Sequence, residues 1–118
     1  MKKIKIYIFH PYSRIGGADL SLSRLINNLN SNKYNITFIT LAKPKIKFYL
    51  KKKIEKLILK KKRALFSIFD LRSIVKRDRE RYSKIIFISN QNFANIISVI
   101  AMSKLKWLKL ILIERNNP

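Results

Sequence analysis

The chain has 118 residues, 47% of them hydrophobic, which is enough for one domain with a modest core. Without cysteine and with a single histidine, His10, it can form no disulfide, and thiolate or histidine-based metal sites are implausible. The net charge of +21 favours anionic partners, and no apolar run reaches the roughly 18 to 20 residues of a membrane span.

The region 3–41 has the pattern of a βαβ unit. Residues 4–9 are β-branched and aromatic, as in a buried strand, and residues 35–41 repeat that composition. Between them, apolar residues recur at helical spacing from Ala18 to Leu29. A strand, a glycine-bearing turn, a helix and a second strand typically open a parallel sheet.

Gly16 and Gly17 are the only glycines of the chain, and they come just before the expected helix. Glycine permits positive φ and lets a ligand approach the backbone, and amides at a helix N-terminus favour phosphate. The alternative is a tight turn without a ligand. Neither GxGxxG nor GxxxxGK[ST] is present, so the pair indicates neither a dinucleotide fingerprint nor a P-loop.

Residues 43–63 form a basic insert that carries much of the positive charge. We expect an amphipathic helix over residues 48–56 and a short strand over 57–60. Basic residues on one face and apolar ones on the other suit an anionic membrane surface. The candidate membrane-surface residues are Lys45, Lys51, Lys52, Lys53 and Lys56. The alternative is a solvated connection whose apolar residues cover the edge of the sheet.

The remaining chain continues the alternation of strands and helices. We expect a helix over 64–81, a central strand over 84–89, a helix over 93–102 and a fifth strand over 109–113. The charged run 77–81 is interpreted as a solvated outer face without chemistry. These elements predict an α/β fold, a Rossmann-like parallel sheet of about five strands with flanking helices.

The net charge alone does not identify the partner. Lys, Ile and Asn are abundant together, which an AT-rich genome produces without selection for a partner. Aromatic residues are not interleaved with the basic ones on one surface, so nucleic acid is a less favoured partner than an anionic membrane. Lys5, His10 and Arg14 interrupt any signal-peptide apolar region. We therefore expect a cytoplasmic protein, with peripheral binding to the inner face of the plasma membrane as an extension.

Several segments in order resemble the N-terminal half of a family 4 glycosyltransferase of the GT-B fold. The resemblance lies in the glycine loop 15–19 and the strand 34–41, and in Ser67 with the helix that follows it. It extends to residues 89–91 and to the ending 113–118, which is similar to the "ERNDP" of glycan-building members. It covers nearly the whole chain except residues 43–56.

The resemblance implies transfer of a sugar from a nucleotide-sugar co-substrate to a glycan or lipid-linked acceptor, in cell-surface polysaccharide synthesis. Such transfer retains the anomeric configuration and uses no metal or other cofactor. Gly16 and Gly17 would approach the donor diphosphate. The implied acceptor and cleft residues are Asn90, Gln91, Glu114, Arg115 and Asn116, where Arg115 replaces a histidine common in the family. The two asparagines could instead be turn formers, and the Glu–Arg neighbours a surface pair.

The family's donor-binding domain and its Glu-x7-Glu element have no counterpart in this chain. We therefore expect residues 1–118 to be a truncated acceptor-side domain that needs a separate C-terminal donor domain and transfers no sugar alone. The alternatives are a basic α/β binding module for anionic membrane or nucleic acid, and a nonfunctional reading frame.

Overall fold

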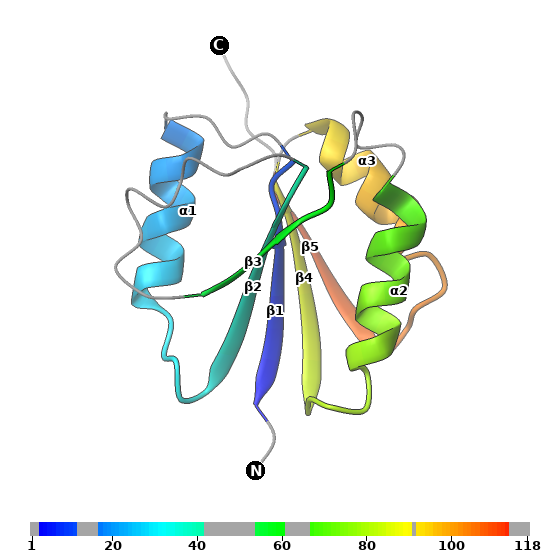
Figure 1. The fold of residues 1–118 in the computed structure, drawn as a ribbon, viewed down its shortest axis with the longest axis horizontal. Helices are drawn as coiled ribbons and strands as arrows, with labels where there is room; N and C mark the ends of the chain where they lie inside the picture. Colours follow the sequence, from blue (N-terminus) through cyan, green and yellow to red (C-terminus); the bar gives the residue numbers. More distant parts are fainter. Residues whose placement is uncertain (1–2, 12–16, 42–53, 61–66, 91, 114–118) are drawn as a thin grey trace.

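A five-stranded parallel sheet with the strand order β3-β2-β1-β4-β5 is the centre of the structure, a computed structural model (Figure 1). The structure describes residues 3–11, 17–41, 54–60, 67–90 and 92–113, without the side-chain surroundings of 17–20, 92 and 93. Its elements are β1 (Ile4–Phe9), α1 (Gly17–Asn28), β2 (Tyr34–Thr40), β3 (Glu55–Ile58), α2 (Ile68–Asp78), β4 (Lys84–Asn90), α3 (Asn92–Ala101) and β5 (Leu108–Ile113). The fold is α/β and Rossmann-like, as the sequence predicts.

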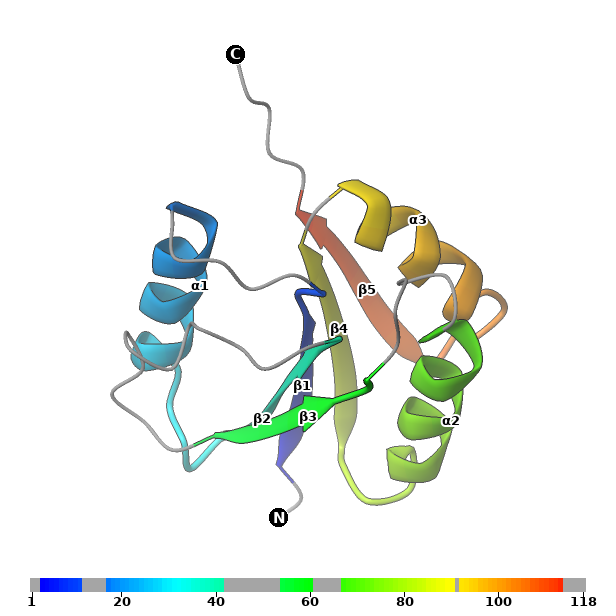
Figure 2. The same cartoon turned by 45° about the horizontal axis from the view of Figure 1, so that its top comes forward.

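The order of the strands reverses direction at β1. From β1 the chain proceeds outward through β2 to β3, and then returns to pair β4 with the other side of β1. Helix α1 covers one face of the sheet, and α2 and α3 cover the other (Figures 1 and 2). In open parallel sheets the point of reversal leaves a crevice beyond the carboxyl ends of the strands, and ligands bind there.

Successive side chains of a strand point to opposite faces, so the apolar core is divided into two clusters, one on each face of the sheet. On the α1 face, Ile6, Ile8 and Phe38 pack with Leu22 and Ile26 of the helix. On the other face, the larger cluster joins aromatic residues of β1 and β4 to α2 and α3; its fully buried members include Tyr7, Phe9, Phe87, Leu71, Val75 and Ile97. Each helix therefore contributes an apolar stripe to one side of the sheet.

The sheet is less completely covered at β5. Ile111 and Leu112 of this edge strand point to opposite faces and are 36% and 40% exposed. An all-parallel sheet normally has helices over both of its faces.

The predicted strands are confirmed, with every boundary within two residues of the observed one, whereas the predicted helix over 48–56 is wrong at its end. Most of that stretch lies outside the described residues, but Glu55 and Lys56 belong to β3 and not to a helix. Hydrogen bonding to β2 fixes their conformation, since Glu55 is in register with Thr37. The strand ends at Ile58, and Lys60 adopts a left-handed conformation with φ 55°.

The interpretation of residues 77–81 as a solvated outer face is also wrong for one residue, which is buried. Asp78, the last residue of α2, is only 3% exposed. Its carboxylate faces the sheet and accepts a hydrogen bond from the Tyr7 hydroxyl of β1. Arg77 and Arg81 pair with the same carboxylate from the solvent side. The charge pattern of residues 77–81 alone could not show that Asp78 faces the sheet while its charged neighbours face solvent.

Two neighbouring isoleucines of α3 offer a matched test of this arrangement. Ile97 is 1% exposed in the core, while Ile96 is 59% exposed. We expect Ile97→Ala to lower the free energy of unfolding by about 2 to 5 kcal/mol, because it leaves a cavity. Ile96→Ala should change it by no more than about 0.5 kcal/mol. Urea denaturation measures both, and equal losses would contradict the described orientation of α3.

Candidate ligand-binding site at the carboxyl edge of the sheet

Three polar side chains form a row across the point where the strand order reverses. Thr40 ends β2, His10 directly follows β1, and Asn90 ends β4. The registers that pair Phe9 with Ile39 and with Ser89 place these three residues next to one another. All three are on the α1 face of the sheet and no more than 1% exposed. A row of buried polar groups at this edge is where the fold allows a ligand to bind.

The backbone holds His10 firmly at the end of β1. Its amide donates to the carbonyl of Ile39 at 3.0 Å, and the carbonyl of Pro11 accepts from the amide of Leu41 at 3.1 Å. The imidazole lies 6.0 Å from the ring of Phe38, between centroids, at an interplanar angle of 57°. Pairing between β1 and β2 thus continues beyond the strand and fixes the position of the ring.

Asn90 fixes the orientation of that ring. Its Nδ2 lies 3.0 Å from Nδ1 of His10, within a buried contact between residues 80 positions apart. With the amide nitrogen as donor, Nδ1 accepts, so the neutral imidazole carries its proton on Nε2. The contact therefore fixes one tautomer of the buried imidazole.

Helix α1 begins at the same edge of the sheet, with Gly17 as its first residue (Figure 1). Gly17 does not have a positive φ, so the backbone conformation here does not require glycine. What Gly17 does provide is a first helical turn without a Cβ at its start, which permits close approach to the amides. Gly16, its predicted partner, lies outside the described residues.

A second polar group lies on the other face of the same edge, under α3. The Nδ2 of Asn95 donates to the carbonyl of Ile113 at 2.9 Å, and thereby ties α3 to the end of β5. Three buried oxygens have no hydrogen-bond partner within the described part of the chain: Ser89 Oγ, Asn95 Oδ1 and Ser98 Oγ. Buried polar atoms usually have partners, so this layer is suited to accept a further donor.

The structure brings together only some of the predicted site residues. Gly17 and Asn90 are at the carboxyl edge, and Lys56 is an exposed residue of β3. The others lie outside the described residues: Gly16, Gln91, Glu114, Arg115, Asn116, Lys45, Lys51, Lys52 and Lys53. Asn90 is the last residue of β4 and is fully buried.

His10 is one of the residues of this edge to which sequence analysis assigned no role. The signal was present, since the only histidine directly follows a strand that reads as buried. Its significance depends on Asn90, which is adjacent only because β4 returns to the side of β1. A search for polar residues immediately after each predicted strand would have found both.

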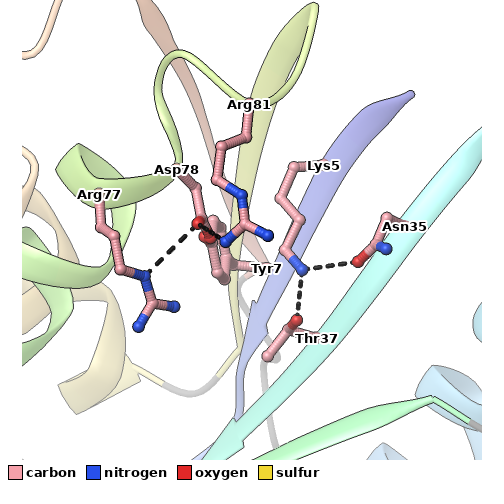
Figure 3. A network of polar contacts seen from close by, with 7 residues as sticks. All are labelled: Lys5, Tyr7, Asn35, Thr37, Arg77, Asp78 and Arg81. Carbon is pink, nitrogen blue, oxygen red and sulfur yellow. Dashed lines mark hydrogen bonds and ion pairs between the residues drawn. The ribbon is translucent and has the colours of Figure 1, made fainter. Parts of the chain in front are cut away.

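A polar network at the opposite, amino edge of the sheet has a structural role (Figure 3). The ammonium of Lys5 donates to Asn35 Oδ1 and Thr37 Oγ1, both at 2.6 Å, and lies 5.2 Å from the centroids of the Tyr7 and Tyr82 rings. The Tyr7–Asp78 hydrogen bond lies next to it. These contacts satisfy a charge that is only 2% exposed within a central strand.

Burial lowers the pKa of Lys5 below the ordinary 10.5, because the ammonium loses solvation. The negative charges of Glu55 and Asp78 oppose this effect, and the positive charges of Arg81 and Arg77 add to it. The lysine is therefore easier to deprotonate in the folded chain than in the unfolded chain. A surface hollow of about 240 Å³ nearby, lined in part by Lys3, is at this amino edge and far from the row containing His10.

Neither a metal site nor a membrane span is found in the described ranges. No group of three His, Cys, Asp or Glu side chains there could hold a metal ion. None of the helices described has both the length and the apolar composition needed to cross a bilayer.

No protein-family model matches the chain, and no curated protein sequence matches it significantly. The function is therefore argued from the fold and from the site at the carboxyl edge.

The hydrogen bond between His10 and Asn90 predicts one tautomer of the imidazole. Long-range ¹⁵N–¹H spectra should show the proton on Nε2, and they report on His10 alone because the chain has one histidine. We expect Asn90→Ala to weaken this preference, and Ser89→Ala, on the other face of β4, to leave it intact. A proton on Nδ1 in the unaltered chain would contradict the assignment.

The lowered pKa of Lys5 predicts a contribution to the pH dependence of stability. Between the folded pKa and 10.5 the unfolded chain binds more protons, so this residue makes the free energy of unfolding rise with pH. We expect Lys5→Met to remove that rise, and Lys84→Met, at an exposed lysine of β4, to retain it. Urea denaturation from neutral pH to pH 10.5 measures the difference, and parallel profiles for all three proteins would contradict it.

Proposed function

We propose that the chain is the acceptor-side domain of a nucleotide-sugar-dependent glycosyltransferase, related to the family 4 enzymes of the GT-B fold. The observation that carries the proposal is the coincidence of three features at one edge of a Rossmann-like sheet. These are the buried pair His10–Asn90, the reversal of strand order, and the start of α1 at Gly17. The order of motifs along the sequence supports the same class.

The chemistry of this edge suits a diphosphate and a sugar hydroxyl. The amides of the first helical turn carry partial positive charge and can donate to a phosphate oxygen. The imidazole of His10, which the contact with Asn90 orients, is a second polar group at the same edge. Both groups are positioned by the sheet before any ligand arrives, which lowers the entropic cost of binding.

Sugar transfer requires donor and acceptor in one geometry, and this domain would supply only one side of the cleft. In the proposal a C-terminal donor domain, separate or following in the same protein, holds the nucleotide. Glu114, Arg115 and Asn116 would then border the cleft from the end of β5. Residues 1–118 by themselves are expected to bind the substrate weakly and to transfer no sugar.

The test is a titration of the ¹⁵N-labelled chain with UDP- and GDP-sugars and with inorganic pyrophosphate. We expect shifts of the first turn of α1 and of the side chains of His10 and Asn90. Gly17→Ala should reduce the response, because the added Cβ obstructs the amides, yet leave the helix intact since Gly17 has no positive φ. Ser21→Ala, one helical turn further along, is the matched control and should respond like the unaltered chain.

Three results would overturn the proposal. The first is the absence of a response at millimolar ligand, and the second is a response confined to the amino edge or to the outer surface of α2. The third is an undiminished response of Gly17→Ala. Sugar transfer by residues 1–118 alone would contradict the division of labour between two domains.

A further inference from the structure

Large apolar side chains gather on the outer surface of α2 and α3. Phe69 is 83% exposed, Ile96 59%, Ile100 51% and Val99 49%. One exposed apolar residue is ordinary on a protein surface, but a contiguous group marks an interaction site. Helix α3 in particular has apolar residues on its outer side as well as on the side that packs against the sheet.

Phe69 and Ile100 belong to one groove between the two helices. The groove has a volume of about 550 Å³ and is lined by Ile68, Phe69, Arg72, Ile100, Ser103 and Lys104. Arg72 of α2 fixes its width, because its Nη1 donates to the carbonyls of Ala101 and Ser103 at 3.0 and 2.7 Å. The end of α3 is thereby tied to α2, so the apolar surface is formed in advance and not by rearrangement.

The rim of the groove is basic. Lys104 follows α3 in a left-handed conformation, with φ 66°, and is exposed, and Arg72 contributes a second positive charge. Asp70 is the acid next to Phe69 in the sequence, and it is partly buried. With a net charge of +21 on the whole chain, a second copy would be repelled from this surface, whereas an anionic partner would be attracted.

We propose that the α2–α3 groove docks the protein on an anionic lipid bilayer. Phe69 and Ile100 enter the interfacial region, and Lys104 and Arg72 face the lipid phosphates. Apolar side chains beneath a basic rim are the combination that holds a protein at such an interface. This surface consists of described residues outside the basic insert 43–63, and its function does not depend on sugar transfer.

The test measures binding to large unilamellar vesicles of phosphatidylcholine with and without phosphatidylglycerol. We expect the chain to bind the anionic vesicles and to bind phosphatidylcholine much more weakly. Phe69→Ser combined with Ile100→Ser should lower the partition coefficient on anionic vesicles by roughly tenfold or more, because two apolar side chains no longer leave water. Leu25→Ser combined with Leu112→Ser is the matched control, since both leucines are exposed outside the groove.

Charge is tested by a second matched pair. Lys104→Asn keeps a residue that tolerates the left-handed conformation, and we expect it to weaken binding more than Lys33→Asn. Lys33 lies in the turn before β2, and its replacement removes the same charge elsewhere. Depth is tested with brominated lipids in a Trp107→Phe background, because Trp107 is the chain's own tryptophan. The lipids should quench a tryptophan introduced by Phe69→Trp and not one introduced by Leu25→Trp.

Equal binding of the groove variant and the control variant would overturn the proposal, because the general charge of the chain would then account for the affinity. So would failure of the unaltered chain to bind either vesicle, which would leave an acidic protein as the occupant of the groove. Circular dichroism of each variant separates these outcomes from loss of the fold.

Discussion

The burial of β1 is the constraint on which the rest of the structure depends. This strand is paired on both edges, with β2 and β4, and covered on both faces, by α1 and by α2 with α3. Its residues Tyr7, Ile8 and Phe9 are at most 1% exposed. A strand in this position leaves no backbone group unpaired and no face for water, so both faces of the sheet need a covering layer of helices.

Polar residues at the two ends of β1 follow from the same constraint. Lys5 at the amino end and His10 at the carboxyl end are almost fully buried, and each must find partners in adjacent strands. Lys5 obtains them from Asn35 and Thr37 of β2, and His10 obtains one from Asn90 of β4. The amino end satisfies its charge within the sheet, whereas the carboxyl end gathers polar side chains at the edge where α1 begins. This difference is why we place the candidate site there.

The sequence predicted the sheet closely because the hydrophobic pattern of a strand depends only on residues that are near one another along the chain. Strands β1, β2, β4 and β5 were predicted almost at their observed boundaries. The prediction failed at Glu55 and Lys56, where pairing with β2 outweighs a helical pattern. It also failed at Asp78, whose burial depends on the packing of α2 against Tyr7. Half of the candidate site, Gly17 and Asn90, was found, while His10 was not assigned a role.

By itself the sequence determined the fold class, the alternation of elements and the position of the glycine pair, because composition and spacing act between residues near one another along the chain. Only the tertiary structure decided which polar residues meet. His10 and Asn90 are 80 positions apart in the sequence. The two walls of the α2–α3 groove, residues 68–72 and 100–104, are likewise distant along the chain. Strand order and helix packing create such contacts, and periodicity carries no information about either.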